Sequence, residues 1–473
     1  MFSNQTYTQR RNALAHQVTN GIMLFLGNEE SPMNYADNTY HFRQDSSFLY
    51  YFGLNLPGLT AIIDADENRT ILFGDELTID HIVWMGTQPS LREQAIGAGV
   101  TDVRPLSTLS GYLQSAQLKN RTIHFLPPYR PENQIKLFKL LSIHPDEQAK
   151  HTSTEMIRAV VEQRAIKEAQ EVVEIEKAVN VTVEMHRTAM RFAQPGMRES
   201  EVAALVANIA LAANGNLSFP IIATINGQTL HNHYHGNIIK SGDMFLLDAG
   251  AETAMGYAGD MSSTFPAGMH FTSRQKDIYQ IALNAHMAAV SALKPDVAFR
   301  DIHTLACKTI AQGMKDLGLM RGNVDDAVEA GAHAMFFPCG LGHMMGLDVH
   351  DMEDLGEVYV GYEGKPKSTL FGIKSLRLAR KLKPGFVLTI EPGIYFIPAL
   401  IDLWKGEKRH TEFLNYDKIE EYRNFGGLRN EEDFLITETG ARLLGEPLAK
   451  TIEEVEYERT FATKRTLFEQ SIH

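Results

Sequence analysis

The chain has 473 residues, of which 44% are hydrophobic and 22% are charged, and its formal net charge is −13. This length allows roughly two to four domains, and the acidic balance argues against general binding of nucleic acid or of anionic membranes, which require basic patches. Two cysteines are too few for a disulfide framework, and neither a signal peptide nor a membrane-spanning apolar run is evident. We therefore expect a cytoplasmic protein with no nucleic-acid or membrane partner.

Strand and helix signals alternate over the first part of the chain. Short apolar runs bounded by Gly, Asn, Asp or Pro predict buried strands at 21–27, 59–65, 69–74 and 121–127. Helical spacing is present at 91–99 and 132–144. We predict a small α/β domain over residues 1–155, which ends in the polar stretch 144–156.

Beyond this boundary, helices and strands occupy separate stretches. Helical spacing covers 162–192, 199–215, 272–293 and 299–317, and strand-rich sequence covers 218–266 and 385–440. Segregated helices and strands favour an α+β arrangement over a parallel barrel.

Two acidic residues flank a glycine-bounded connection that predicts a β-hairpin. Asp248 follows two leucines, and Asp260 precedes the strand-like run MSSTFP. In a hairpin both carboxylates can point to one face of the sheet. A buried carboxylate needs a partner, because desolvating an unpaired charge is costly, and a metal ion is one such partner. The alternative is that Asp248 is a turn acid and Asp260 a surface acid.

Further candidate ligands lie in apolar or glycine-rich surroundings. His343 and His350 fall in CGLGHMMGLDVHD, Glu391 lies in VLTIEPGIYF, and Glu431 directly precedes another strand. A single histidine in such a segment is more often a core residue than a ligand. Four carboxylates and one imidazole, however, form a hard ligand set that suits Mn²⁺, Co²⁺ or Zn²⁺, and two ions rather than one.

These motifs resemble those of the pita-bread metallopeptidases, in the aminopeptidase P and prolidase branch. GYAGD, GLGH with GLDVHD, EPGIYFI and FGGLRNEED occur in the family's order, and FRQDSSFLYYFG at 42–53 resembles the signature of its N-terminal domain. The resemblance implies an α+β pita-bread catalytic domain over 156–473, behind an aminopeptidase P-type α/β domain. It also implies two divalent metal ions, manganese first and cobalt or zinc as alternatives, held by Asp248, Asp260, His343, Glu391 and Glu431.

The family also implies catalytic roles. Asp260 and Glu431 bridge the two ions, and Glu391 accepts a proton from water and passes it to the leaving nitrogen. Arg429, two residues before Glu431, orients that ligand.

Substrate contacts follow from the same resemblance. His231 matches a histidine beside the substrate, with His233 as its competitor in a histidine-rich loop, and His350 matches one that stabilises the reaction intermediate. Cys339 stands where the family often has histidine. Trp84, in HIVWMG, matches a tryptophan that covers the substrate of a neighbouring subunit in some members; the alternative is a packed core tryptophan.

The implied activity is hydrolysis of the Xaa-Pro bond, either in dipeptides or at the N-terminus of longer peptides, by a homodimer or homotetramer. Arg377 matches the arginine that binds the free carboxylate of a dipeptide, which favours prolidase-like specificity; the alternative is a surface charge in a basic run. A metal-free pita-bread module that only binds peptides is the competing function, and the intact ligand set argues against it.

Overall fold

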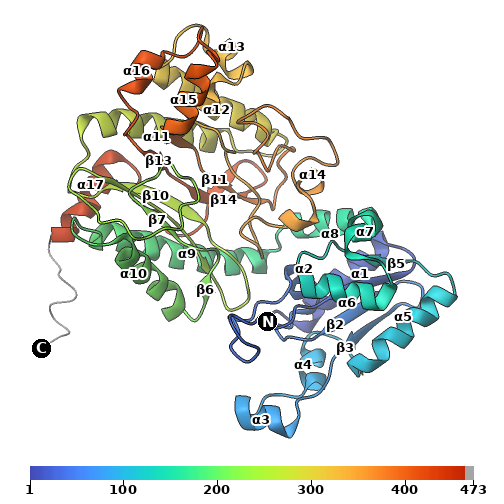
Figure 1. The fold of residues 1–473 in the computed structure, drawn as a ribbon. Helices are drawn as coiled ribbons and strands as arrows, with labels where there is room; N and C mark the ends of the chain where they lie inside the picture. The colour runs from blue at the N-terminus through green and yellow to red at the C-terminus, as the bar shows by residue number, and fades with distance from the viewer. Residues whose placement is uncertain (464–473) are drawn as a thin grey trace, which may run out of the picture. The chain divides into compact units, whose positions relative to one another are not determined.

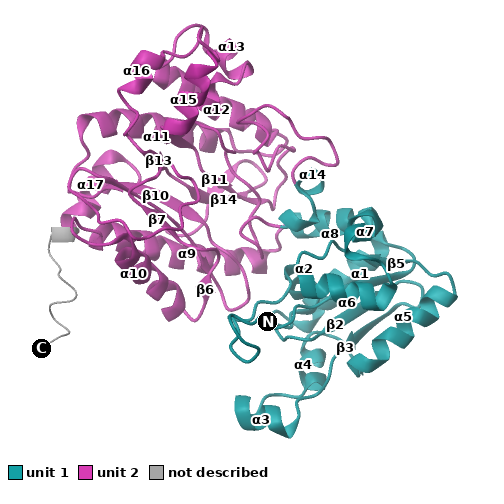
Figure 2. Cartoon of the chain, viewed as in Figure 1, with its two compact units in different colours: residues 1–165, 352–360 teal, residues 166–351, 361–473 magenta. Residues whose placement is uncertain are grey.

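The computed structural model describes residues 1–463 and separates the chain into two compact units. The first comprises 1–165 together with 352–360, and the second comprises 166–351 and the chain from 361 onward (Figure 2). The polar stretch 144–156 is helical: it forms α7 (Pro145–His151) and the start of α8 (Thr154–Ala165). Pro145 suits the first turn of a helix, and Asp146 and Glu147 complement the positive end of its dipole.

The first unit contains a five-stranded sheet in the order β4-β3-β2-β1-β5, of which β2, β3 and β5 are labelled in Figure 1. Its strands are β1 (Ile22–Leu26), β2 (Thr60–Asp64), β3 (Arg69–Phe73), β4 (Asp102–Arg104) and β5 (Ile123–Phe125). β1 pairs antiparallel with β2 and parallel with β5, and β3 pairs antiparallel with β2 and parallel with β4. The four predicted strands are confirmed, and the three-residue β4 was not predicted.

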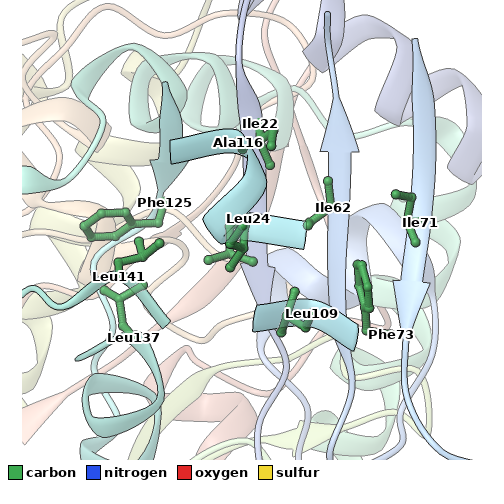
Figure 3. Packing of buried hydrophobic residues seen from close by; sticks show 11 residues of the cluster. Ile22, Leu24, Ile62, Ile71, Phe73, Leu109, Ala116, Phe125, Leu137 and Leu141 are labelled. Carbon is green, nitrogen blue, oxygen red and sulfur yellow. The ribbon is translucent and has the colours of Figure 1, made fainter. Parts of the chain in front are cut away.

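Helices accompany this sheet, and two of them complete a hydrophobic core with it. They are α1 (Asn4–Gln17), α2 (Ser46–Phe52), α3 (Ile79–Met85), α4 (Leu91–Gly97), α5 (Leu109–Leu118), α6 (Pro131–Leu141), α7, α8 and the short α14 (Glu357–Val360), with 3-10 turns η1 (Leu106–Thr108) and η3 (Glu353–Leu355). Alternate residues of a strand share one face of the sheet, and Ile22 and Leu24 of β1 pack in one buried cluster with residues of α5 and α6 such as Leu109 and Leu137 (Figure 3).

The second unit is built from several small sheets with long helices. Its sheets run β10-β8-β7, β11-β14-β15, β12-β13 and β6-β9. The strands are β6 (Asn216–Leu217), β7 (Ile222–Thr224), β8 (Met244–Ala249), β9 (Ala251–Glu252), β10 (Met261–Pro266), β11 (Val387–Ile390), β12 (Gly393–Tyr395), β13 (Gly427–Arg429), β14 (Glu432–Ile436) and β15 (Ala441–Leu443). This arrangement confirms the α+β class.

The helices of the second unit occupy most of the predicted helical stretches. They are α9 (Ala169–Phe192), α10 (Glu199–Ala212), α11 (Ser273–Ala292), α12 (Phe299–Asp316), α13 (Val324–Glu329), α15 (Pro398–Gly406), α16 (Tyr416–Glu420) and α17 (Ile452–Arg459), with η2 (Ala332–Met335) and η4 (Thr460–Thr463). The single helical stretch expected over 162–192 is wrong: it is split between α8 and α9, because Lys167 donates its backbone N–H to Gly385 instead of continuing the helix. Among residues 1–463, no helix is both long and apolar enough to cross a bilayer.

Candidate metal centre and substrate cavity

A cavity of about 220 Å³ in the second unit gathers residues that are far apart in the sequence. It is lined by Asp248, Asp260, His343, Glu391 and Glu431, by His231, His233, Cys339, His350, Arg377 and Arg429, and by an apolar group that includes Phe219, Pro220, Ile222, Leu230 and Val349. The apolar members were not singled out by the sequence, because apolar residues near strand ends are indistinguishable from core.

The predicted hairpin is confirmed and brings the first two acids together. β8 and β10 pair antiparallel, with Asp248 opposite Ser262, and Asp260 directly precedes β10. The two ends of the connection between β8 and β10 lie close together. A Cβ at Gly250 would lie 1.9 Å from the carbonyl oxygen of Gly259. Glycine is therefore required where the hairpin begins to turn.

His343 and Glu391 are positioned by a second pair of adjacent segments. The backbone of His343 accepts a hydrogen bond from the N–H of Thr389 at 3.0 Å, and the N–H of Glu391 donates to Leu341 at 2.8 Å. The approach is close enough that a Cβ at Gly342 would lie 2.0 Å from the Thr389 carbonyl oxygen. Glu391 follows directly after β11, whereas the sequence predicted it inside the strand.

The ligand atoms converge. Asp260, His343 and Glu431 each offer one ligand atom within 4.8 Å of the other two. His343 Nε2 lies 3.3 Å from Asp260 Oδ2 and 3.8 Å from Glu391 Oε1. The other ring nitrogen, Nδ1, is 3.0 Å from the Met344 carbonyl oxygen, which fixes that nitrogen as the donor and leaves Nε2 available as a ligand.

Burial is the main cause that shifts the pKa values of three of these carboxyl groups upward. Burial raises the pKa of Asp260, and the charge of Asp248 acts in the same direction. Burial and the neighbouring Asp260 raise the pKa of Glu431 well above its ordinary value, and burial raises that of Glu391. Glu431 Oε1 is buried and makes no hydrogen bond to any residue of 1–463. This set of buried carboxylate oxygens, with the Nε2 nitrogen of His343 beside them, fits divalent cations, which stabilise the ionised carboxylates.

Arg429 links Asp248 and Glu431 through hydrogen bonds. Its guanidinium donates to Ser262 Oγ at 2.8 Å, to the Tyr395 hydroxyl at 2.8 Å and to Asp248 Oδ2 at 2.5 Å. Ser262 in turn donates to Glu431 Oε2 at 2.8 Å, so Arg429 reaches Glu431 through this hydroxyl. Burial alone lowers the pKa of Arg429, but Tyr395 and the nearby acids, Asp248 first among them, raise it overall.

Sequence reasoning missed Ser262 and Tyr395. Ser262 lies two residues after Asp260, and Tyr395 lies four residues after Glu391. The even spacing along an extended segment was the available signal, since alternate residues share a face.

The histidines that were expected to contact the substrate line the cavity. His231 and His233 both line it, so the geometry does not separate them. Partial burial lowers the pKa of His231, and the positive charge of Arg429 adds to the effect. The His350 ring packs edge-on against His343, with ring centroids 4.3 Å apart.

Cys339 and Arg377 lie at the same cavity. Removal from water raises the pKa of the Cys339 thiol to about 12, so it is neutral at pH 7. Arg377 is half-buried and lines the cavity, and its charge lowers the pKa values of both His231 and Glu391. Its backbone is held by close packing, because a Cβ at Gly361 would lie 1.8 Å from the Arg377 carbonyl oxygen.

Trp84 belongs to the other unit, where it lies on α3 with 84% of its surface exposed. The alternative of a packed core tryptophan is therefore wrong. Ile79, Val83 and Met85 of the same short helix are exposed by 71%, 72% and 68%. Such a concentration of exposed apolar side chains is typical of an interaction surface.

Comparison with known proteins gives matches over nearly the whole chain. Residues 173–438 match the model of metallopeptidase family M24, and residues 7–124 match that of the aminopeptidase P N-terminal domain. A human Xaa-Pro dipeptidase is 33% identical over 444 residues, which cover 92% of this chain and 88% of that protein. A probable Xaa-Pro aminopeptidase of Aspergillus niger is 29% identical over 453 residues, 92% of each chain. The fold is similar to that of zinc-substituted Escherichia coli aminopeptidase P in complex with product, with a TM-score of 0.80, 26% identity and coverage of 98% of this chain and 100% of that one.

Proposed function

Because the chain belongs to metallopeptidase family M24, we propose that it is a proline-specific exopeptidase that hydrolyses the Xaa-Pro bond, with dipeptides as its preferred substrates. The observation that carries the activity is the convergence of four carboxylates and His343 on one small cavity. A metal-free function does not account for this set, because buried carboxylates such as Asp260 and Glu431 are costly without a cation. A peptide-binding module without metal is therefore not favoured.

We assign two divalent ions to this cavity, manganese first, with cobalt and zinc as alternatives. Asp248 and Asp260 would hold one ion, His343 and Glu391 the other, and Asp260 and Glu431 would serve as ligands of both. Divalent ions polarise a scissile carbonyl and lower the pKa of water. The supporting observations are the 3.3 Å approach of His343 Nε2 to Asp260 and the unsatisfied Glu431 Oε1.

Side chains of the cavity then transfer the proton and contact the substrate. Glu391 has a raised pKa, which suits a group that accepts a proton and later releases it to the proline nitrogen. His350 donates a hydrogen bond to the carbonyl oxygen as negative charge develops there, a role supported by its ring packing beside His343. His231 or His233 contacts the substrate from the cavity wall, and the Cys339 thiol takes part as a neutral contact.

Preference for dipeptides rests on Arg377. A dipeptide presents a carboxylate one residue beyond the scissile bond, whereas a longer peptide presents a neutral amide there. A guanidinium binds a carboxylate by two charge-assisted hydrogen bonds. Arg377 lies at the cavity and near Glu391, which supports this assignment.

We further propose a cytoplasmic homodimer or homotetramer in which Trp84 of one chain covers the substrate of another. The exposed apolar side chains of α3 support an interface there. Sedimentation of wild type and Trp84→Ala, with KM for a dipeptide, tests this proposal: a monomeric wild type or an unchanged KM would contradict it.

Hydrolysis of Ala-Pro, Ala-Pro-Ala and Ala-Ala by the Mn²⁺-supplemented protein tests the activity. We expect cleavage of Ala-Pro above Ala-Pro-Ala and none of Ala-Ala. Asp260→Ala should lose cleavage while keeping the wild-type circular dichroism spectrum, because Asp260 is assigned to both ions. Turnover close to wild type in the folded variant would contradict the two-ion assignment, and equal cleavage of Ala-Ala would contradict the proline specificity.

A further inference from the structure

A second group of potential metal ligands lies in the second unit, on elements that supply none of the cavity ligands. His303 and Cys307 lie one helical turn apart on α12, so they share a face, and His333 lies in η2. Their exposed fractions are 1%, 1% and 0%. One ligand atom from each lies within 4.8 Å of the other two.

The polar atoms of this group are poorly satisfied by the protein. Cys307 Sγ lies 3.5 Å from His303 Nε2. Among residues 1–463, neither His303 Nδ1 nor either ring nitrogen of His333 has a hydrogen-bond partner of ordinary geometry. Buried polar atoms are nearly always hydrogen-bonded or bound to an ion, so two buried imidazoles that lack well-formed hydrogen bonds beside a thiol require a specific explanation.

We propose that His303, Cys307 and His333 bind one thiophilic divalent metal ion of the zinc class, separate from the ions of the substrate cavity. In a tetrahedral zinc site, bonds of about 2.3 Å to sulfur and about 2.0–2.1 Å to nitrogen put sulfur and nitrogen roughly 3.6 Å apart. The distance between Cys307 Sγ and His303 Nε2 is 3.5 Å. Three atoms within 4.8 Å of one another share a point about 2.8 Å or less from each (4.8 Å divided by √3). Small side-chain shifts then reach the bond lengths.

The protonation states suit such an ion. Burial lowers the pKa of His303 to about 3 and that of His333 to about 4, although the Val328 carbonyl opposes the shift of His333. Both imidazoles are therefore neutral at pH 7, as metal ligands must be. Burial raises the pKa of Cys307, so the ion must displace the thiol proton, and binding releases a proton.

The ligand chemistry separates this site from the cavity. One sulfur and two nitrogens select zinc or cobalt, whereas a carboxylate-rich set suits manganese. The ion would join α12 to η2, and the ring of Phe337, just after η2, packs 5.6 Å from the His303 ring. The ion would therefore hold η2 in place, and η2 is the start of the segment that continues to His343.

Cobalt spectroscopy tests the proposal, because only a sulfur ligand gives a thiolate-to-cobalt charge-transfer band in the near ultraviolet. We expect metal-free full-length protein titrated with Co²⁺ to develop this band by three equivalents, because the two ions of the substrate cavity can bind first. The chain has two cysteines, so Cys339→Ser is the matched control. The band should disappear in Cys307→Ser and persist in Cys339→Ser. Its absence from the wild type, or its loss only in Cys339→Ser, would overturn the proposal.

A measurement on the wild type keeps the test independent of whether Cys307→Ser folds. Zinc-edge X-ray absorption of protein preloaded with Mn²⁺ and given one equivalent of Zn²⁺ should show one sulfur neighbour at about 2.3 Å. A zinc environment of oxygen and nitrogen alone would exclude the site. Neither experiment depends on peptidase activity.

Discussion

Replacement of Arg377 by alanine should lower hydrolysis of Ala-Pro far more than hydrolysis of Ala-Pro-Ala. Arg377 lies at the cavity in a half-buried position. Hydrogen bonds to charged groups contribute roughly 1.5–3 kcal/mol. Partial exposure places the effect near the lower part of this range, at about 2 kcal/mol, which corresponds to about 30-fold in kcat/KM.

The assay is kcat/KM for both peptides with the wild type, Arg377→Ala and Lys381→Ala. Lys381 is an exposed cation in the same basic run, so it controls for a general change in charge. We expect the ratio of Ala-Pro to Ala-Pro-Ala hydrolysis to fall about 30-fold in Arg377→Ala and to stay unchanged in Lys381→Ala. Equal losses on both peptides, or no loss, would refute the assignment of Arg377 to the dipeptide carboxylate and would favour aminopeptidase P specificity.

Arg429→Lys should lower kcat about 10- to 100-fold, because lysine keeps the charge but loses the three-way fork; steady-state kinetics at saturating Mn²⁺ check this, and wild-type kcat would contradict it. Gly361→Ala places a Cβ 1.8 Å from the Arg377 carbonyl oxygen and should reduce both thermal stability and dipeptide selectivity, whereas Gly406→Ala, in open space, should change neither. In the first unit, burial raises the pKa of Asp64, but hydrogen bonds from Arg121 and Tyr112 outweigh it and hold the pKa below its ordinary 3.8. Ionised Asp64 therefore stabilises the fold above about pH 4, and the contribution is lost as the pH falls through the lower folded-state pKa. The difference in unfolding free energy between the wild type and Asp64→Asn should shrink from pH 7 to pH 3; a constant difference would contradict this.

The sequence was informative where chemistry and local pattern coincide. Asp248 and Asp260 could be placed on one hairpin because the glycines between them permit the turn and the flanking runs are apolar. Their convergence with His343, Glu391 and Glu431 could be inferred only from a resemblance, because no local pattern specifies how β8, β11 and β14 are arranged in space.

The supporting groups could not be predicted for the same reason. Ser262 is one of many strand hydroxyls, and its bridge between Arg429 and Glu431 depends on contacts across more than 160 residues. Likewise, His303 and Cys307 show helical spacing, but His333 reaches them only through the fold. The polar stretch 144–156 was expected as a boundary, although its proline and acidic residues equally suit a helix start.

Anomalous diffraction at the manganese edge, from crystals of the Mn²⁺-loaded protein, tests the two-ion centre most directly. We expect two anomalous peaks between Asp248, Asp260, His343, Glu391 and Glu431, with Asp260 and Glu431 in contact with both. A single peak, or manganese bound elsewhere with these five side chains free of metal, would contradict it.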